Sequence, residues 1–142
     1  MLISTKGRYA LRILIDMAEH QSDSYIPLKD VAARQEISEK YLETIVKLLV
    51  KDGILVGLRG KGGGYRLNRE PKDYSVGEIL RLAEGTLAPV SCLDCKPNKC
   101  ERAASCRTLP MWEKLNTLIS NYLYSVSLAD LIDSSIVGDY QI

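Results

Sequence analysis

Apolar residues recur at helical spacing near the start of the chain. From Thr5 to His20 most of them fall three or four positions apart, whereas a half-buried strand would alternate every second residue. Ser4 and Thr5, which open this stretch, are residue types that cap helix N-termini. The pattern therefore predicts an amphipathic first helix. Its apolar residues are Tyr9, Leu11, Ile13, Leu14, Met17 and Ala18.

Two further helical stretches follow with a short interruption between them. Residues 25–35 place Pro27 where a helix can begin. After the break at 36–38, Ser38 can cap a third helix that runs until Gly53. Two short helices joined by a tight turn predict a helix-turn-helix. The expected inward residues are Leu28, Val31 and Ala32 in the second helix and Leu42, Ile45, Val46 and Leu49 in the third.

After the third helix the pattern becomes that of a β-hairpin. Residues 54–60 (ILVGLRG) favour a strand, the KGGG run at 61–64 provides positive φ angles, and 65–68 (YRLN) return as a second strand. Three helices followed by a two-stranded ribbon predict a winged helix. The glycine run does not match a P-loop, because the Lys and Ser/Thr of that motif are missing.

The C-terminal half adds two predicted helices. Ser75 and Glu78 form a capping-box pattern that opens a helix over 75–85. Residues 110–126 carry apolar side chains at heptad-like spacing, on a face wider than one core contact needs. We expect a dimerisation helix here, and the alternative is a monomer in which it packs on the first helix. Its apolar residues are Met111, Trp112, Leu115, Leu118, Ile119, Tyr122, Leu123 and Val126.

Charge and hydropathy narrow the class of protein. The first apolar stretch carries Lys6, Arg8 and Asp16, so it lacks the uncharged run of a signal peptide, and no segment approaches 18 uncharged apolar residues. We therefore expect a cytoplasmic protein with no membrane partner. The net charge is only +1, but basic residues are in excess over acidic ones in the first half, where the winged helix is predicted.

The third helix and the wing are candidates for binding double-stranded DNA. In a helix-turn-helix the second helix enters the major groove, where Glu can accept from cytosine and Lys can reach guanine or phosphate. A basic wing can enter a narrow minor groove, and the first-helix amides can hold a phosphate. The alternatives are solvated charges, plain capping, and a winged helix that contacts only proteins. The predicted DNA-binding residues are Ser4, Thr5, Lys6, Ser38, Glu39, Lys40, Tyr41, Glu43, Thr44, Arg59, Lys61 and Tyr65.

All four cysteines of the chain lie in one short polar stretch. Cys92, Cys95, Cys100 and Cys106 have the spacing C-x2-C-x4-C-x5-C, and the residues between them cannot build a core. A bound metal or cluster is therefore expected to organise this stretch, and thiolates select zinc or iron–sulfur clusters. Zinc is less expected, because only one C-x2-C pair is present and the sole histidine, His20, belongs to the end of the first helix.

We expect no enzymatic activity. A thioredoxin-like oxidoreductase would place Cys92 and Cys95 in a βαβ context, and none surrounds them. A nucleophilic cysteine would need a histidine base, and the lone His20 is remote in sequence.

The predicted fold class is mainly α with a small β-hairpin, a winged helix-turn-helix plus a long C-terminal dimerisation helix. We expect residues 1–84 to form the DNA-binding domain, 85–109 a cysteine-rich cluster-binding loop, and 110–142 the dimerisation helix and C-terminal segment. A length of 142 residues suffices for one domain with an appendage.

Three strings of the sequence resemble one family of bacterial winged-helix transcriptional regulators, which includes IscR, NsrR and CymR. They are ISTKGRYAL near the start, ISEKYLETIVKLLVKDGIL in the middle and RGKGGGYRL at the wing. The resemblance extends through SLADLID at 127–133. It implies a homodimeric transcription factor with the helix after Ser38 in the major groove and Arg59 in the minor groove. It also implies that Glu43 discriminates between operator classes.

The resemblance further implies an iron–sulfur cluster, of either the 2Fe–2S or the 4Fe–4S type, held by three cysteines. Cys100 and Cys106 match the last two of these, and either Cys92 or Cys95 matches the first. The fourth ligand departs from the family, because Leu109 stands where IscR-like members have histidine and Arg8 where NsrR-like members have aspartate. Our hypothesis is that the additional cysteine completes an all-thiolate site.

A metal-free regulator is the closest alternative within the same family. A CymR-like repressor of cysteine or sulfur metabolism would bind DNA without metal and respond to an enzyme partner or to thiol oxidation. The segment EGTLAPV at 84–90 fits that branch too. A zinc-stabilised winged-helix repressor is the remaining alternative.

Overall fold

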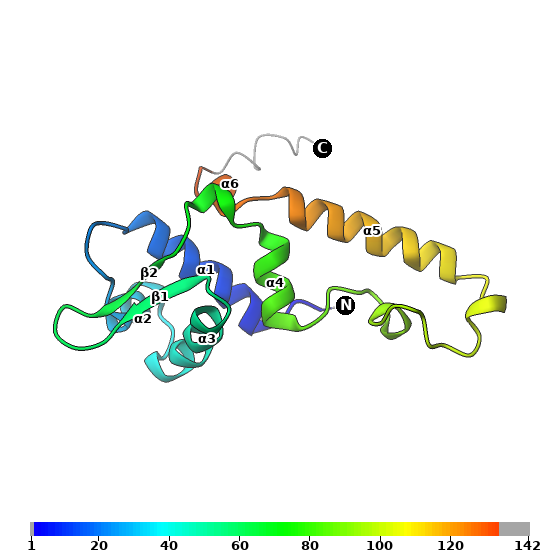
Figure 1. Cartoon of the computed structure of the whole chain (residues 1–142), viewed down its shortest axis with the longest axis horizontal. Helices are drawn as coiled ribbons and strands as arrows, with labels where there is room; N and C mark the ends of the chain where they lie inside the picture. Colours follow the sequence, from blue (N-terminus) through cyan, green and yellow to red (C-terminus); the bar gives the residue numbers. More distant parts are fainter. Residues whose placement is uncertain (1, 134–142) are drawn as a thin grey trace.

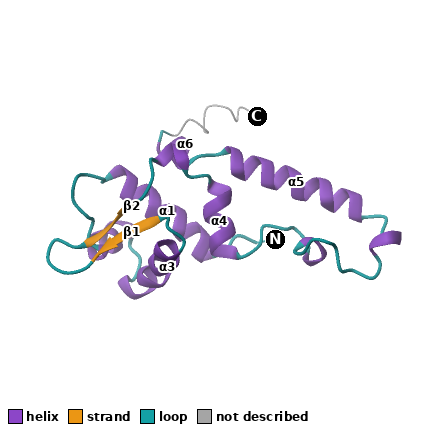
Figure 2. Cartoon of the chain, in the orientation of Figure 1, coloured by secondary structure: helices purple, strands orange, loops and turns teal. Residues whose placement is uncertain are grey.

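A computed structural model of the protein describes residues 2–133, which contain six α-helices and one two-stranded antiparallel sheet (Figure 1). Helix dominates, and the strands are confined to one hairpin (Figure 2). The predicted fold class, mainly α with a small β-hairpin, is confirmed. The elements are α1 (Thr5–Glu19), α2 (Leu28–Gln35), α3 (Glu39–Lys51), β1 (Leu55–Leu58), β2 (Gly64–Leu67), α4 (Val76–Glu84), α5 (Leu109–Ser125) and α6 (Leu128–Ile132).

Serine side chains begin four of these helices, and three of the four are as the sequence predicts. Ser4 accepts the Gly7 N–H at the start of α1, and Ser38 accepts the Tyr41 N–H at the start of α3. Ser75 caps α4 in the same way. The predicted capping box is only half formed, because the Glu78 carboxylate instead pairs with Arg69 at 2.7 Å. Glu78 therefore ties α4 to the chain that leaves the hairpin.

The turn between α2 and α3 depends on one residue in the left-handed region. Glu36 ends α2 with φ 54°, and Ile37 then returns its side chain to the core with 7% exposure. This reversal places α3 across α2, so the helix-turn-helix predicted from residues 25–53 is formed.

The wing is joined to the chain that precedes α2. β1 and β2 pair antiparallel, with Leu55 opposite Leu67. Ile26 and Tyr65 exchange two backbone hydrogen bonds of 2.8 Å beside this pair. Gly64 must be glycine here, because its φ is +151° and a Cβ would lie 2.3 Å from the Ile26 carbonyl oxygen. The positive φ predicted for the glycine run is thus observed.

One core unites the helices of the winged domain. All four α3 residues predicted to point inward are at most 1% exposed, and they pack against Ile13, Leu14 and Met17 of α1. Tyr74, which is fully buried, joins this core to the hairpin. Its hydroxyl donates to the Ile54 carbonyl at 2.7 Å and accepts the N–H groups of residues 68 and 69. The phenol thereby fixes the base of the wing.

The C-terminal segment returns to the winged domain after α5. Leu128 of α6 is fully buried in the main core, and its N–H donates to the Tyr74 carbonyl at 2.9 Å. The Val76 N–H donates to the Val126 carbonyl at 2.8 Å. The division at 84 and 109 remains a prediction, and residues 134–142 of the predicted third segment lie outside the described residues.

Helix α5 extends away from the winged domain, and the C-terminal end of α5 contacts α4 (Figure 1). Contact is close because α4 has a glycine there: a Cβ at Gly77 would lie 2.6 Å from the ring of Tyr124. No residue of α5 is buried. The helix therefore projects as an arm from this contact.

A buried carboxylate joins α1 to α2. Asp16 is 1% exposed and accepts hydrogen bonds from Arg34 Nη2 at 2.7 Å and Gln35 Nε2 at 2.8 Å. Burial alone raises the pKa of Asp16, but the hydrogen bonds from Arg34 and Gln35 and the Arg34 charge outweigh it and hold the pKa below its ordinary value. The carboxylate is therefore ionised in the folded protein and anchors α2.

We expect Asp16→Asn to lower the free energy of unfolding by about 2 kcal/mol, because Arg34 would keep only a neutral acceptor. The pKa of Asp16 is lower in the folded protein than its ordinary value of 3.8. The wild-type carboxylate therefore stabilises the fold fully at pH values above 3.8, and this stabilisation is lost as the pH falls through the lower pKa of the folded state. Urea denaturation at successively lower pH should show the difference shrinking. Glu19→Gln, an exposed carboxylate of the same helix, is the control, and equal stability of Asp16→Asn and wild type at neutral pH would contradict the assignment.

Candidate functional site

The first turns of α3 present an exposed polar surface. Ser38, Glu39, Lys40, Glu43 and Thr44 are all exposed, and the opposite face of the helix is buried in the core. The Thr44 hydroxyl donates to the Lys40 carbonyl at 3.3 Å, within the helix. This is the surface that a helix-turn-helix presents to a major groove. The contact of these five residues with DNA remains a prediction.

Tyr41 has a packing role as well as a predicted DNA contact. It is partly buried, and its ring meets the Tyr9 ring edge-on at 5.8 Å between centroids. Arg12 in turn lies over the Tyr9 ring at 4.9 Å and donates to Gln35. This group of side chains connects the start of α3 to α1 and α2.

The start of α1 is already bound to the end of α4. The Ser4 N–H and hydroxyl donate to the same Glu84 oxygen, at 3.0 and 2.7 Å. A Cβ at Gly7 would lie 2.3 Å from this oxygen, so a side chain there would displace the Glu84 carboxylate. Ser4 thus acts in helix capping, the alternative weighed from the sequence. Thr5 and Lys6 lie beside it, and a DNA contact at Ser4, Thr5 or Lys6 remains a prediction.

The wing carries the remaining predicted DNA-binding residues. Arg59 and Lys61 are exposed at the turn of the hairpin. Tyr65 is partly buried, and its ring covers Gly57 so closely that a Cβ there would lie 3.0 Å from it. Tyr65 therefore shapes the inner face of the wing, whereas the two cations are available to solvent.

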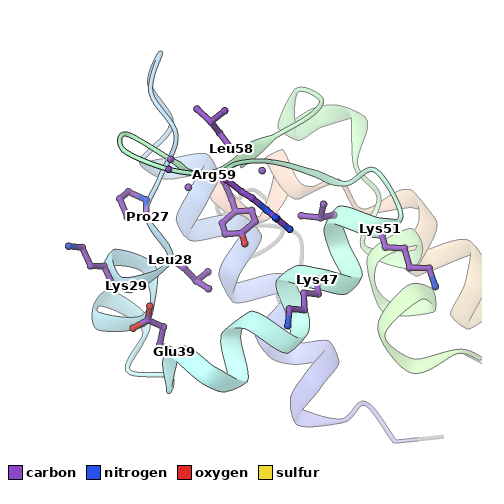
Figure 3. A pocket seen from close by; sticks show the side chains of 14 residues that line it. Pro27, Leu28, Lys29, Glu39, Lys47, Lys51, Leu58 and Arg59 are labelled. Atoms are coloured by element: carbon purple, nitrogen blue, oxygen red, sulfur yellow. The ribbon is translucent and has the colours of Figure 1, made fainter.

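A cleft of about 720 Å³ separates the wing from α3. Arg59 extends across it from the wing, and Lys29, Lys47 and Lys51 border it (Figure 3). Our sequence-based list of DNA-binding residues lacked these three lysines. The signal that could have found two of them is the spacing of Glu43, Lys47 and Lys51, which recur every four residues along one face of α3.

The four cysteines lie in the connector between α4 and α5, which we define as residues 85–108. Cys92 belongs to a short 3₁₀ turn and Cys106 follows another, and all four thiols are free. Among residues 2–133, no three Cys, His, Asp or Glu side chains lie close enough together to hold a metal ion. The structure thus places the predicted ligands in one segment but does not bring them together.

The connector itself has little packing. Leu87 is its one buried residue among those described. The Asn98 Oδ1 accepts the Cys100 N–H at 2.9 Å, while its buried Nδ2 has no partner within the described residues. A segment with so few buried contacts can change conformation without disturbing a core. The donor chemistry, four thiols in one connector, fits an iron–sulfur or zinc centre.

His20 is not near this connector in sequence or in its contacts. It caps the end of α1, with Nδ1 2.8 Å from the Asp16 carbonyl oxygen. This is the helix-end role expected from the sequence.

Cys106 differs electrostatically from an ordinary exposed thiol. Its Sγ lies 3.4 Å from the Thr108 hydroxyl. This hydroxyl, together with the backbone amides of Thr108 and Leu109 at the start of α5, lowers the pKa of Cys106. The thiolate form, which binds metals and reacts with electrophiles, is favoured at this position.

Helix α5 has two apolar faces, one turned to the chain itself and one to solvent. The face turned inward is partly buried, and its apolar residues include Trp112, Ile119 and Leu123. The second face is exposed, with Met111 at 53% and Leu118 at 58% exposure. It consists of Met111, Leu115, Leu118 and Tyr122. Because α5 packs mainly on α4, the predicted alternative of packing on α1 does not account for this second face.

None of the helices between residues 2 and 133 has the length and apolar character needed to cross a bilayer.

The helix-turn-helix, the wing and the exposed polar start of α3 define a winged-helix transcriptional regulator. Residues 3–134 match the Rrf2 family, described as an iron-dependent transcriptional regulator, and the chain belongs to this family. The resemblance found in the sequence is thereby confirmed. A family of transcriptional regulators also agrees with the prediction that the protein is not an enzyme.

The similar proteins include regulators of two kinds. The HTH-type transcriptional regulator IscR of Photobacterium profundum is 34% identical over 132 residues, which are 93% of this chain and 76% of that protein. The structure of CymR, the global cysteine regulator of B. subtilis, has a TM-score of 0.77 at 34% identity and covers 94% of this chain and 98% of its own. IscR of T. potens has a TM-score of 0.74 at 34% identity, with 100% and 93% coverage.

The lowered pKa of Cys106 leads to a test on metal-free protein. Thr108→Val should slow alkylation of Cys106 by iodoacetamide near neutral pH, because the hydroxyl that stabilises the thiolate is lost. Mass spectrometry of the digested protein measures the rate at each cysteine, and the rate at Cys100 should not change. An unaltered Cys106 rate in the variant would show that the hydroxyl does not stabilise the thiolate.

Proposed function

We propose that the protein is a homodimeric transcriptional regulator whose affinity for its DNA operator is controlled by an iron–sulfur cluster in the connector. The observation that carries the proposal is the connector itself: four free thiols in a segment with one buried residue, located between the DNA-binding domain and the long helix. Such a segment has no apolar reason to adopt one conformation, and a ligand would provide it. The proposal includes a cytoplasmic location, in which the thiols would stay reduced.

DNA recognition in this proposal uses the start of α3 and the wing. The exposed Glu39, Lys40, Glu43 and Thr44 contact base edges or phosphates in the major groove. Arg59 and Lys61 of the wing contact the minor groove. Ser38 and Tyr41 position the helix through the cap and the ring contact described above. Thr5 and Lys6 add a backbone contact beside the capped start of α1, and Tyr65 shapes the inner face of the wing.

The connector supplies the cluster ligands in this proposal. Cys100 and Cys106 provide two of them, and Cys92 and Cys95 complete an all-thiolate set. A bound cluster, of the 2Fe–2S or 4Fe–4S type, would supply redox chemistry and would cross-link the connector through its thiolates. The low pKa of Cys106 favours its ligating form without metal present. Because the thiols stand apart in the described structure, the connector must rearrange to gather them.

Rearrangement of the connector is coupled to DNA binding through both of its ends. One end follows Glu84, which binds the start of α1, and the other leads directly into α5. In a homodimer, α5 sets the separation of the two winged domains, which must match half-sites about 34–36 Å apart or a multiple of this. A coupling free energy of about 1–3 kcal/mol would change operator affinity about 5–150-fold.

A metal-free, CymR-like repressor is the second candidate. The observation that favours it is that the cysteines are not gathered among the described residues, and the structural similarity to CymR is as close as that to IscR. In that case an enzyme partner or thiol oxidation would alter the connector instead of a cluster. Zinc held by the same thiols is a third arrangement.

Anaerobic reconstitution with iron and sulfide separates these candidates. The wild type should become coloured and retain iron and sulfide in comparable amounts, whereas the variant with all four cysteines replaced by serine should stay colourless. Operator gel shifts at fixed salt should then differ about 5–150-fold between cluster-loaded and cluster-free wild type. A colourless wild type that retains zinc would reject the cluster. Normal regulation by the all-serine variant would support the metal-free candidate that answers to an enzyme partner.

The exposed face of α5 is the proposed dimer interface, and a charge placed on it tests this. Leu118→Asp should weaken the dimer by about 3 kcal/mol, or about 100-fold, because burying an unpaired carboxylate in an apolar contact is unfavourable. Analytical ultracentrifugation over a range of protein concentrations measures the effect. Asn121→Asp adds the same charge on the polar side of α5 and should leave the dimer intact. A wild-type monomer would contradict the homodimer.

A further inference from the structure

The charged residues that line the cleft between the wing and α3 are mainly cations. Four cations border it, from three separate elements: Lys29 from α2, Lys47 and Lys51 from α3, and Arg59 from the wing. Glu39 is the one carboxylate among its lining residues. None of the four cations makes an ion pair or side-chain hydrogen bond with another described residue. The cleft thus has a net positive charge that the described part of the chain does not compensate.

The lysines occupy a defined position along α3. Glu39, Glu43, Lys47 and Lys51 recur every four residues on one exposed face, with acids in the first half of the helix and lysines in the second. Both halves face away from the core. The first half is suited to base edges that donate hydrogen bonds, such as cytosine N4. The second half has only cationic donors, so it is suited to phosphates.

The geometry of duplex DNA explains why such a cleft should lie here. The major and minor grooves are separated by a sugar–phosphate backbone. If α3 enters the major groove and the wing enters the adjacent minor groove, the strand between those grooves must pass between α3 and the wing. The cleft occupies this position, and Figure 3 shows Lys29 on one side of it, the α3 lysines on the other and Arg59 between them.

We propose that this cleft holds the sugar–phosphate backbone of one DNA strand, with Lys29, Lys47 and Lys51 as phosphate-binding residues. The proposal rests on the DNA-binding function proposed above and adds three residues and a defined path for the strand. Arg59 belongs both to the wing and to the cleft, because its guanidinium reaches from the wing into the cleft. Glu39, the one carboxylate of the lining, repels phosphates and is suited to a base edge that donates a hydrogen bond.

The salt dependence of DNA binding provides a direct test. Each lysine that neutralises a phosphate contributes about 0.9 to the slope of log affinity against log salt concentration. Lys47→Gln combined with Lys51→Gln should therefore reduce the slope by about 1.8, and Lys29→Gln by about 0.9. Affinity should fall by the same factor for a selected operator duplex and for a scrambled duplex of equal length, because phosphates carry no sequence information.

A double variant of equal charge change is the matched control. Lys72→Gln with Lys114→Gln removes two exposed lysines away from the cleft and should leave the slope unchanged. Thermal melts should show that all variants fold like the wild type, since the replaced side chains are exposed. An unchanged slope for the cleft variants, or a loss confined to the operator duplex, would overturn the proposal.

The same experiment gives a different result if the protein does not bind DNA. A wild-type protein that binds neither duplex at any salt concentration would reject DNA binding itself. A wild type that binds the operator with the same slope as the cleft variants would reject only the path of the strand.

Discussion

The arrangement of the wing, α4 and α6 depends on the hydrogen bonds of the Tyr74 hydroxyl group. It donates to the Ile54 carbonyl and accepts two backbone N–H groups after β2, so both strands of the wing are held at their base. The backbone carbonyl of Tyr74 accepts the Leu128 N–H, which brings α6 back to the core. Wing, α4 and α6 therefore meet at one buried side chain. Because a buried polar group without partners is destabilising, this meeting point tolerates few alternatives.

Local signals predicted the elements well, whereas long-range contacts were not predictable. Ser4, Ser38 and Ser75 begin helices through bonds that span only three residues, and such patterns are visible in one sequence. The roles of Asp16 and Tyr74 depend on partners 18 to 20 positions away, and nothing in the local pattern identifies these partners. The return of α6 to the core was missed for the same reason. The unformed half of the Glu78 capping box shows a tertiary ion pair prevailing over a local motif.

The candidate site was predictable in part, for similar reasons. The exposed start of α3 follows from helical periodicity, since its inward residues define the opposite face. The cleft lysines come from two helices, so they become one site only when α2, α3 and the wing are placed together. Ser4 caps α1, one of the two roles that the sequence left open, but its bond to Glu84, 80 positions away, could not be predicted from the local pattern. The cysteines are close in sequence, but among residues 2–133 they do not form a group that could hold a metal ion, so closeness in sequence alone does not provide a common centre.

Gly77 has no side chain, and this has a mechanical consequence for α5. Tyr124 packs directly on the α4 backbone there, so the contact acts as a fulcrum near one end of α5. The 17 residues of α5 form a rod about 25 Å long, and its other end carries the thiol-bearing connector. A displacement of about 4 Å at that far end corresponds to a tilt of only about 10° at the fulcrum. In the proposed function, a sizeable rearrangement around the thiols would thus become a small rotation of α5 against the DNA-binding domain.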